Sequence, residues 1–409
     1  MFKKSPLAPA RFPALAAVAG VRVSGIAAGL KESGRPDLFL AEFMKGSTVA
    51  GVFTESKCSS APVDWCRSIL KHGRIRGLVV NSGNANAFTG RAGIRTVEHT
   101  VAAAAKRLGC RRNEVYIAST GVIGVPVPQD YIASKLPDVA KRLGKTKWAA
   151  AAASIMTTDT FPKAAMRKVK IGKAEVSIVG IAKGSGMIAP DMATMLSFVF
   201  TDAKIPAPVL QRLLKDAADR SFNSITVDSD TSTSDTLLLA ATGQVRHPKV
   251  SGIGDAHLKD FREALRAVCI DLATQVVRDG EGAQKLVTID VSGAESAAAA
   301  RRIGLAVANS PLVKTAIAGG DPNWGRIVMA VGKAGEKADR DKLSIGMGGV
   351  PITVEGQLVK GYDESITEKH MAGSEIEIAL DVGVGRGKAR VWTCDLTHGY
   401  IEINADYRT

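Results

Sequence analysis

A glycine-rich polar segment leads directly into a threonine and then into an apolar stretch. Residues 183–186 (Lys-Gly-Ser-Gly) precede Ala193 and Thr194, and residues 195–201 are strongly apolar. This arrangement suits an N-terminal nucleophile, because the Thr194 hydroxyl can attack the carbonyl carbon of Ala193 and the resulting ester can be hydrolysed. A threonine at the start of a strand is also a common β-forming residue, so spacing alone leaves both interpretations open.

Cleavage before Thr194 would create a base without using a histidine. The new α-amine would titrate near pH 7.7–8.0, which leaves a useful fraction neutral at about physiological pH. It could then take the proton from the hydroxyl of the same residue. The neighbouring Gly184-Ser185-Gly186 turn could also cradle an anion, although a flexible turn explains it equally well.

The spacing of histidines and cysteines predicts no metal centre. None of the histidines stands at metal-ligand spacing from another, and five widely separated cysteines form no Cys-x-x-Cys pair. We therefore expect no metal centre and no disulfide framework, and a reducing cytoplasmic location. The histidines are His72, His99, His247, His257, His370 and His398.

Charge and composition favour an enzyme acting on small molecules. The 54 Lys and Arg residues exceed the 40 Asp and Glu residues by 14, but they are scattered and form no block of five. Aromatic residues, at 5%, are too sparse to predict stacking platforms for nucleic acid. No run of 18 apolar residues predicts a transmembrane helix, and Pro6, Pro9 and Pro13 interrupt the N-terminal stretch that could mimic a signal peptide. We expect neither nucleic-acid nor membrane binding.

Strands and helices are expected to alternate along the chain. In the first half the sequence predicts strands at 77–80 and 114–119, a hairpin at 169–181, and helices at 91–109, 129–143 and 147–156. Pro137 is a candidate break in the second of these helices. In the second half it predicts strands at 195–201, 235–241 and 285–292, and helices at 207–221, 255–278 and 296–318. Residues 374–407 are predicted to form antiparallel strands. This mixture favours an α/β (α+β layered) fold in two or three lobes.

Several longer motifs occur in one order along the whole chain. They lie at residues 49–54, 60–66, 81–87, 119–124, 156–160, 183–196, 278–282, 320–326 and 403–409. This sequence resembles the ornithine acetyltransferase family, the bifunctional glutamate N-acetyltransferases of arginine biosynthesis. The resemblance implies a two-lobed, N-terminal-nucleophile-like, self-cleaving acyltransferase fold. It also implies an α chain of residues 1–193 and a β chain of residues 194–409, which assemble as an α2β2 heterotetramer.

The resemblance also implies residue roles. Thr194 matches the nucleophile, the Ala193–Thr194 bond matches the cleavage point, and Thr120 with Gly121 matches the pair that stabilises the oxyanion. Lys183 suits a substrate carboxylate and Glu281 a substrate amine. The positions that match substrate-binding residues are Thr157, Lys183, Thr194, Glu281, Asn404 and Thr409. Asp191 departs from the family pattern, in which Asn is more usual, and adds a negative charge near Thr194.

The activity implied by the resemblance is acetyl transfer from N2-acetylornithine to glutamate through an acetyl-threonine intermediate. This activity needs no metal or prosthetic group, and acetyl-CoA is a possible additional donor substrate. Two alternatives stay open from the residues. A related aminopeptidase or amidase would use the same threonine with water as acceptor, and a basic binding protein would have an intact chain and salt-sensitive nucleic-acid binding.

Overall fold

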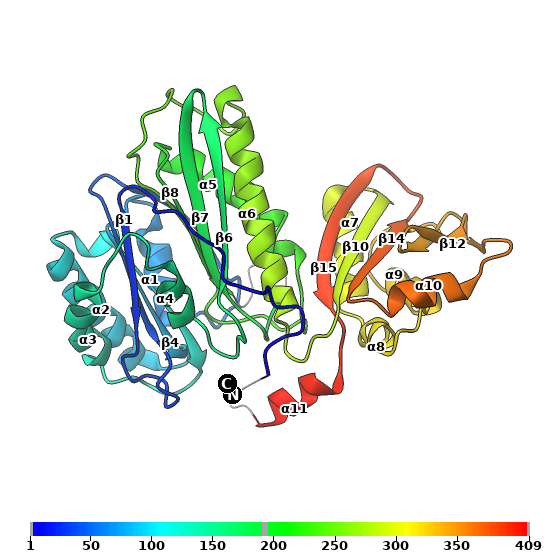
Figure 1. Ribbon diagram of the computed structural model, residues 1–409, viewed down its shortest axis with the longest axis horizontal. Helices are drawn as coiled ribbons and strands as arrows, with labels where there is room; N and C mark the ends of the chain where they lie inside the picture. The colour runs from blue at the N-terminus through cyan, green and yellow to red at the C-terminus, as the bar shows by residue number, and fades with distance from the viewer. Residues whose placement is uncertain (1–2, 190–194, 407–409) are drawn as a thin grey trace. The chain divides into compact units, whose positions relative to one another are not determined.

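The structure is a computed structural model that describes residues 3–189 and 195–406. The described chain divides into two compact units, which agrees with the two lobes expected from the sequence. The larger unit contains residues 9–223 and 230–276. The smaller unit contains residues 3–8, 224–229 and 277–406. Each unit has its own sheets and its own core, and each is described by itself below (Figure 1).

The first sheet of the larger unit contains both predicted oxyanion residues. Its strands lie in the order β1 (Val21–Ile26), β2 (Leu38–Phe43), β4 (Gly77–Asn84) and β5 (Val115–Val122). The first two pairs are antiparallel, whereas β4 and β5 are parallel. A parallel pair needs a crossover, which α2 (Gly90–Leu108) supplies. Gly109 ends this helix in the left-handed conformation, with φ 59°.

The second sheet of the larger unit carries the strands on either side of the predicted nucleophile. Its order is β3 (Thr48–Phe53), β9 (Thr236–Ala241), β8 (Leu196–Thr201), β7 (Ala174–Lys183) and β6 (Lys163–Ile171). β6 and β7 form the predicted hairpin about Gly172. β7 and β8 pair in antiparallel register with Lys183 opposite Leu196, and β8 runs parallel to β9.

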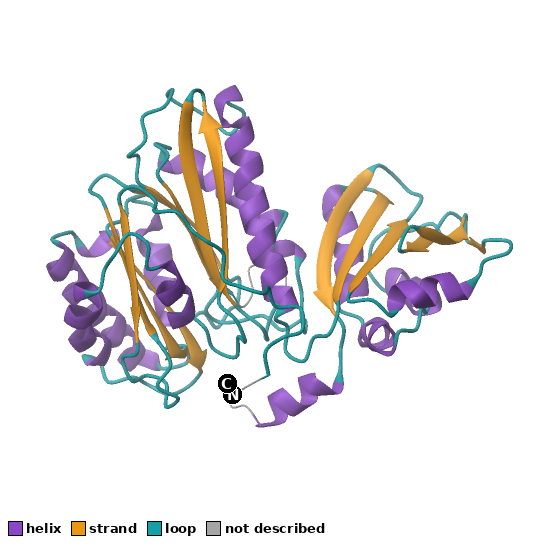
Figure 2. Ribbon diagram, viewed as in Figure 1, coloured by secondary structure: helices purple, strands orange, loops and turns teal. Residues whose placement is uncertain are grey.

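The two sheets of the larger unit face each other across an aromatic core. Phe39 and Phe43 of β2 stack on Phe198 and Phe200 of β8, with ring centroids 6.0 and 5.9 Å apart. Each such pair contributes about 0.5–1.5 kcal/mol beyond its buried area. The helices that contact the first sheet are α1 (Ala61–Leu70), α2, α3 (Tyr131–Lys141) and α4 (Trp148–Ser154). Those that pack on the second are α5 (Ala207–Asp219) and α6 (Lys259–Arg278) (Figure 2).

The smaller unit is one mixed sheet covered by helices on one face. The strand order is β13 (Gln357–Leu358), β12 (Val350–Val354), β11 (Ser344–Met347), β14 (Glu375–Asp381), β10 (Leu286–Ala294) and β15 (Gly387–Cys394). Side chains of β14 alternate strictly between exposed and buried, as expected when only one face is covered. The helices are α7 (Ala297–Ala308), α8 (Pro311–Gly319), α9 (Trp324–Gly332), α10 (Glu364–Met371) and α11 (His398–Asp406).

Two of the predicted elements are wrong. The single helix expected at 296–318 is two helices, because Pro311 cannot continue α7 and instead begins α8. Residues 374–407 are not a set of paired antiparallel strands. β14 and β15 lie on opposite sides of β10, and residues 398–406 form α11. The predicted break at Pro137 is absent, since α3 continues past it to Lys141.

Candidate active site

Lys183 and Thr120 meet at the ends of two strands in the larger unit. Lys183 is the last residue of β7, Thr120 lies near the end of β5, and their side chains are 4% and 8% exposed. The Lys183 ammonium donates to the Thr120 hydroxyl oxygen at 3.2 Å. An ammonium has no acceptor, so this contact uses a lone pair of the hydroxyl and leaves the hydroxyl hydrogen able to donate elsewhere. This is the polarity that an oxyanion donor requires.

Gly121 occupies a backbone position that only glycine fits. Its φ is 127°, a backbone angle that residues other than glycine rarely adopt. A Cβ atom added there would lie 2.4 Å from the carbonyl carbon of Gly83 and 2.6 Å from the amide nitrogen of Asn84. Because β4 and β5 approach so closely here, the position that follows Thr120 requires a glycine.

A buried carboxylate, Asp159, holds the backbone beside two predicted substrate-binding residues. One oxygen accepts from the Lys163 ammonium at 2.6 Å and from the Gly184 amide at 2.7 Å. The other accepts from the Thr157 amide at 2.8 Å. Gly184 follows Lys183 in the chain, so a single side chain fixes the backbone next to both Thr157 and Lys183.

The charges around Asp159 keep it ionised. Burial by itself would raise its pKa, but the positive charges of Lys163 and Lys183 and the hydrogen bonds that it accepts hold the pKa well below the usual range. Asp159 and Lys163 have fully buried side chains, and a buried ion pair needs this degree of hydrogen bonding to offset desolvation. Nearby Lys31 has a pKa lowered to about 8, mainly by burial and by Arg35.

In the smaller unit, Glu281 and Asn404 contact each other. Glu281 follows α6, is 8% exposed, and accepts a hydrogen bond from the Asn404 side-chain amide at 2.8 Å. Asn404 lies on α11 and also donates to the Tyr400 carbonyl at 3.0 Å. A buried carboxylate held by an amide can receive a substrate ammonium group, which is the role that the resemblance implies.

Comparison with known proteins gives the family. The sequence profile described as "ArgJ family" matches residues 22–409. The chain is 57% identical to the arginine biosynthesis bifunctional protein ArgJ of Gluconobacter oxydans, over 100% of this chain and 97% of that protein. It is 54% identical to the protein of the same name from Brucella suis, over 99% of both chains. The chain belongs to the ArgJ family.

A solved structure of an ArgJ family member supports the same assignment. The arginine biosynthesis bifunctional protein ArgJ of Bacillus halodurans is 37% identical, with a TM-score of 0.50, and the match covers 52% of this chain and 100% of that one. The resemblance drawn from the sequence motifs is therefore confirmed. The α/β layers expected with it are also present in both units.

Some of the residues expected in the ArgJ site lie outside the described part of the chain. These are Asp191, Ala193, Thr194 and Thr409. Their roles, and the cleavage before Thr194, stay predictions. The predicted residues that the structure describes fall into two sets: Thr120, Gly121, Thr157 and Lys183 belong to the larger unit, whereas Glu281 and Asn404 belong to the smaller one.

Sequence reasoning missed Asp159 and Lys163. Their spacing of four residues is also that of an ordinary surface ion pair, and the resemblance assigns a role only to Thr157 within the motif at 156–160. One signal was present in the sequence. Lys163 stands between Phe161 and the Ala164-Ala165 pair, an apolar context in which a lysine needs a buried partner.

No group of three or more His, Cys, Asp or Glu side chains is arranged to hold a metal ion within residues 3–189 and 195–406. Over the same residues, no helix is both long and apolar enough to span a membrane.

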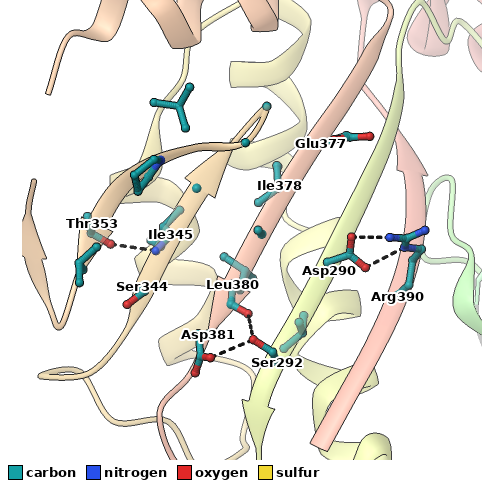
Figure 3. Close-up of a pocket in the computed structure, with 18 of the residues that line it drawn as sticks. Asp290, Ser292, Ser344, Ile345, Thr353, Glu377, Ile378, Leu380, Asp381 and Arg390 are labelled. Atoms are coloured by element: carbon teal, nitrogen blue, oxygen red, sulfur yellow. Dashed lines mark hydrogen bonds and ion pairs between the residues drawn. The ribbon is translucent and has the colours of Figure 1, made fainter.

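A hollow of about 910 Å³ lies on the uncovered face of the sheet in the smaller unit. Figure 3 shows Asp290 facing Arg390 across β10 and β15, in a two-pronged pair of 2.7 and 2.8 Å. Ser292 donates to Asp381 at 3.0 Å in the same view. Asp290 and Arg390 are thus paired with each other, and none of the predicted site residues lines this hollow.

Proposed function

We propose that this protein transfers the acetyl group of N2-acetylornithine to glutamate, giving ornithine and N-acetylglutamate in arginine biosynthesis. The observation that carries the proposal is the family match over nearly the entire chain, with relatives named as bifunctional arginine biosynthesis proteins. The contact between Lys183 and Thr120 supports it, because that contact leaves a hydroxyl hydrogen available to an oxyanion.

The first half-reaction acylates Thr194. Its hydroxyl oxygen attacks the acetyl carbonyl carbon of acetylornithine, and its own α-amine, freed by cleavage after Ala193, takes the hydroxyl proton. The Thr120 hydroxyl and the Gly121 amide donate to the oxyanion of the tetrahedral species. Collapse breaks the amide C–N bond, and the leaving nitrogen of ornithine takes the proton back from the α-amine.

The second half-reaction returns the enzyme to its starting state. The glutamate amine attacks the acetyl-threonine ester and passes through a similar tetrahedral species, so the same two donors serve again. Collapse breaks the ester C–O bond, and the proton lost by the glutamate amine passes through the α-amine of Thr194 to the Thr194 hydroxyl oxygen. Lys183 binds a substrate carboxylate and Glu281 a substrate ammonium. No metal or prosthetic group takes part in these steps. Acetyl-CoA would enter only as an alternative donor to Thr194.

The closest alternative chemistry is hydrolysis. A Thr-nucleophile aminopeptidase or amidase would form the same kind of ester and give it to water. The arginine biosynthesis names of the full-length relatives favour transfer to glutamate. We further propose that the cleaved α and β chains assemble as an α2β2 heterotetramer in the cytoplasm.

One assay separates these activities. Purified protein is supplied with N-acetylornithine with and without glutamate, and in a third reaction with acetyl-CoA and glutamate. Formation of N-acetylglutamate from acetylornithine, dependent on glutamate, is the expected result. Acetate release at the same rate without glutamate would instead identify a hydrolase. Product in the third reaction would add the acetyl-CoA-dependent activity.

A further inference from the structure

Two cationic side chains from the loop between β1 and β2 reach the segment that contains Thr157. The Lys31 ammonium donates to the carbonyl oxygen of Met156, the residue before Thr157, at 2.6 Å. The Arg35 guanidinium donates to the carbonyl oxygen of Asp159 over a longer distance, 3.5 Å. Neither cation has a role in the proposed reaction, although their contacts lie on either side of a predicted substrate-binding residue.

The same loop packs against the strand that adjoins the predicted oxyanion pair. A Cβ atom added to Gly83 of β4 would lie 2.9 Å from the Leu30 carbonyl oxygen and 3.0 Å from Lys31 Cγ. Gly83 is in turn the register partner of Gly121 on β5. A single glycine therefore separates the stem of Lys31 from the backbone position that the oxyanion pair uses.

Asp37 and the loop backbone hold Lys31 in place. One Asp37 carboxyl oxygen accepts from the Leu30 and Lys31 amides at 2.7 and 3.0 Å, and the other accepts from the Ala28 amide at 2.5 Å. The Lys31 ammonium also donates to the Pro36 carbonyl oxygen at 2.9 Å. Carbonyl oxygens thus take two of its three hydrogens, and no residue in the described part of the chain takes the third.

The surroundings of Lys31 carry an excess of positive charge. Burial is the main cause that lowers the pKa of Lys31 to about 8; Arg35 and Lys183 lower it further, whereas Asp37 and Asp159 raise it. Asp159 is already engaged in its buried ion pair, so one carboxylate remains against three cations. Within residues 3–189 and 195–406, neither Lys31 nor Arg35 forms an ion pair. A bound anion would correct this imbalance.

The two amino acids of the proposed reaction differ at the end of the side chain, where ornithine carries an ammonium group and glutamate a second carboxylate. Lys183 is assigned to one substrate carboxylate and Glu281 to a substrate ammonium, which leaves the second carboxylate of glutamate without a partner. We propose that Lys31 and Arg35 form the subsite for this side-chain carboxylate and so select a dicarboxylic acceptor. The inference rests on the proposed function, and both residues belong to the larger unit.

The donors of Lys31 and Arg35 suit a carboxylate. The ammonium has one hydrogen to give, and the guanidinium, which has five N–H groups in a planar fork, makes one long hydrogen bond within the described chain. A carboxylate has two oxygens that can accept from both groups, and hydrogen bonds between charged partners are the strong ones. A side-chain amide has the shape of the carboxylate but neither its charge nor its second acceptor oxygen.

The test compares glutamate with glutamine as acceptors of the acetyl group of N-acetylornithine. The two acceptors differ in side-chain charge, so the ratio of their kcat/KM values measures how strongly the enzyme selects that charge. Lys31→Met and Arg35→Gln remove the cation and keep most of the side chain's length. In each variant the preference for glutamate over glutamine should fall by roughly 10- to 100-fold, mainly through a higher KM for glutamate.

Exchange of labelled ornithine into N-acetylornithine is the companion reaction, because it transfers the acetyl group to an acceptor without a side-chain carboxylate. In both variants the exchange rate should fall much less than the rate of glutamate acetylation. A purely structural role, such as fixing the Met156 carbonyl beside Thr157, would lower the two rates together.

Lys285→Met is the matched control. Lys285 of the smaller unit also donates to two carbonyl oxygens, those of Ile317 at 2.8 Å and Met371 at 2.6 Å, and burial also lowers its pKa. The substitution removes the same charge and the same kind of contacts at a place outside the proposed subsite. The preference for glutamate over glutamine should therefore stay at the wild-type value.

Thermal unfolding shows which variants are folded, and each folded subsite variant is decisive by itself. An unchanged preference for glutamate in either Lys31→Met or Arg35→Gln would overturn the inference, and so would an equal loss of preference in Lys285→Met. Glutamate acetylation and ornithine exchange that fall by the same factor would also overturn it. A wild type that neither acetylates glutamate nor exchanges ornithine would instead refute the proposed function itself.

Discussion

At the scale of single residues, the site depends on how a few buried charges are satisfied. Lys183 donates to Thr120, and Asp159 takes a charged hydrogen bond from Lys163 together with two backbone amides. These contacts fix the direction in which the Thr120 hydroxyl can donate and the place of the backbone beside Lys183. Burial strengthens these electrostatic interactions, because the protein interior screens charges less than water does.

Removing the Thr120 hydroxyl should slow both half-reactions. Thr120→Val keeps the size of the side chain but removes one of the two predicted oxyanion donors. The rates of acetylation by acetylornithine and of acetyl transfer to glutamate should therefore each fall on the order of 10²-fold. Thr100→Val is the matched control, since Thr100 is fully buried in the same unit and its hydroxyl makes no hydrogen bond. Similar rates for the two variants would remove Thr120 from the oxyanion site.

The buried pair of Asp159 and Lys163 predicts a specific acid sensitivity. The folded-state pKa of Asp159 is depressed, so its contribution to stability is complete above the ordinary aspartate value of about 4 and is lost as the pH falls toward the lower folded value. Asp159→Asn should cost about 3–5 kcal/mol at neutral pH because it leaves Lys163 without its carboxylate. The variant should also lose less stability than the wild type between about pH 4 and pH 2. Urea unfolding across this range measures both effects, and parallel pH curves would contradict the account.

At the scale of the elements, several of the predicted site residues lie at or near the ends of strands. Thr120 and Gly121 lie near the end of β5, and Lys183 ends β7. The strands place these groups because every neighbouring pair is fixed in register by a ladder of backbone hydrogen bonds.

Gly121→Ala tests the close approach of β4 and β5. A methyl group there would meet the Gly83 and Asn84 backbone, so the variant should be strongly destabilised or misfolded and inactive. Gly124→Ala is the control, because Gly124 also has a positive φ of 83° but nothing within 4 Å of an added Cβ. Thermal unfolding and activity measure both. A Gly121→Ala variant no less stable than Gly124→Ala would show that β4 and β5 can separate.

Much of this layout could be predicted from local sequence, and the rest depended on distant pairing. The hairpin about Gly172 and strand β8 follow from short apolar runs bounded by turns. The pairing of β10 with β14 could not be predicted in this way, because the paired residues are about ninety positions apart in the sequence. An alternating pattern predicts a strand but does not indicate which other strand it pairs with. The role of Asp159 was missed for the same reason, since local spacing does not reveal which groups are buried together.

At the scale of the whole molecule, the predicted cleavage point falls within one unit rather than between two. β7 lies before it and β8 after it, and these strands are neighbours in one sheet. The α and β chains would therefore share the core of the larger unit, in which β2 packs on β8. The boundary between the two predicted chains, after residue 193, therefore does not coincide with the boundaries between the two compact units.

This arrangement predicts fragments that are cut but not separated. Denaturing electrophoresis of the purified protein should show two chains of about 20 and 23 kDa, in proportion to their lengths within 42.9 kDa. Native gel filtration should show both chains in one peak, because separating β7 from β8 would expose a sheet edge and part of the aromatic core. Thr194→Ala should give one uncut, inactive chain. Fragments that separate without denaturant would contradict the shared sheet.

The central claim is that Thr194 carries the acetyl group between donor and acceptor. The most direct measurement is intact-mass analysis of the protein after incubation with N-acetylornithine alone and rapid acid quenching, followed by fragmentation of the 194–409 chain. The account predicts one added acetyl group on that chain, located at its first residue and removed by a chase with glutamate. Rapid acetyl transfer to glutamate with no acetylated chain at any quench time would show direct transfer in a ternary complex, and Thr194 would lose its assigned role.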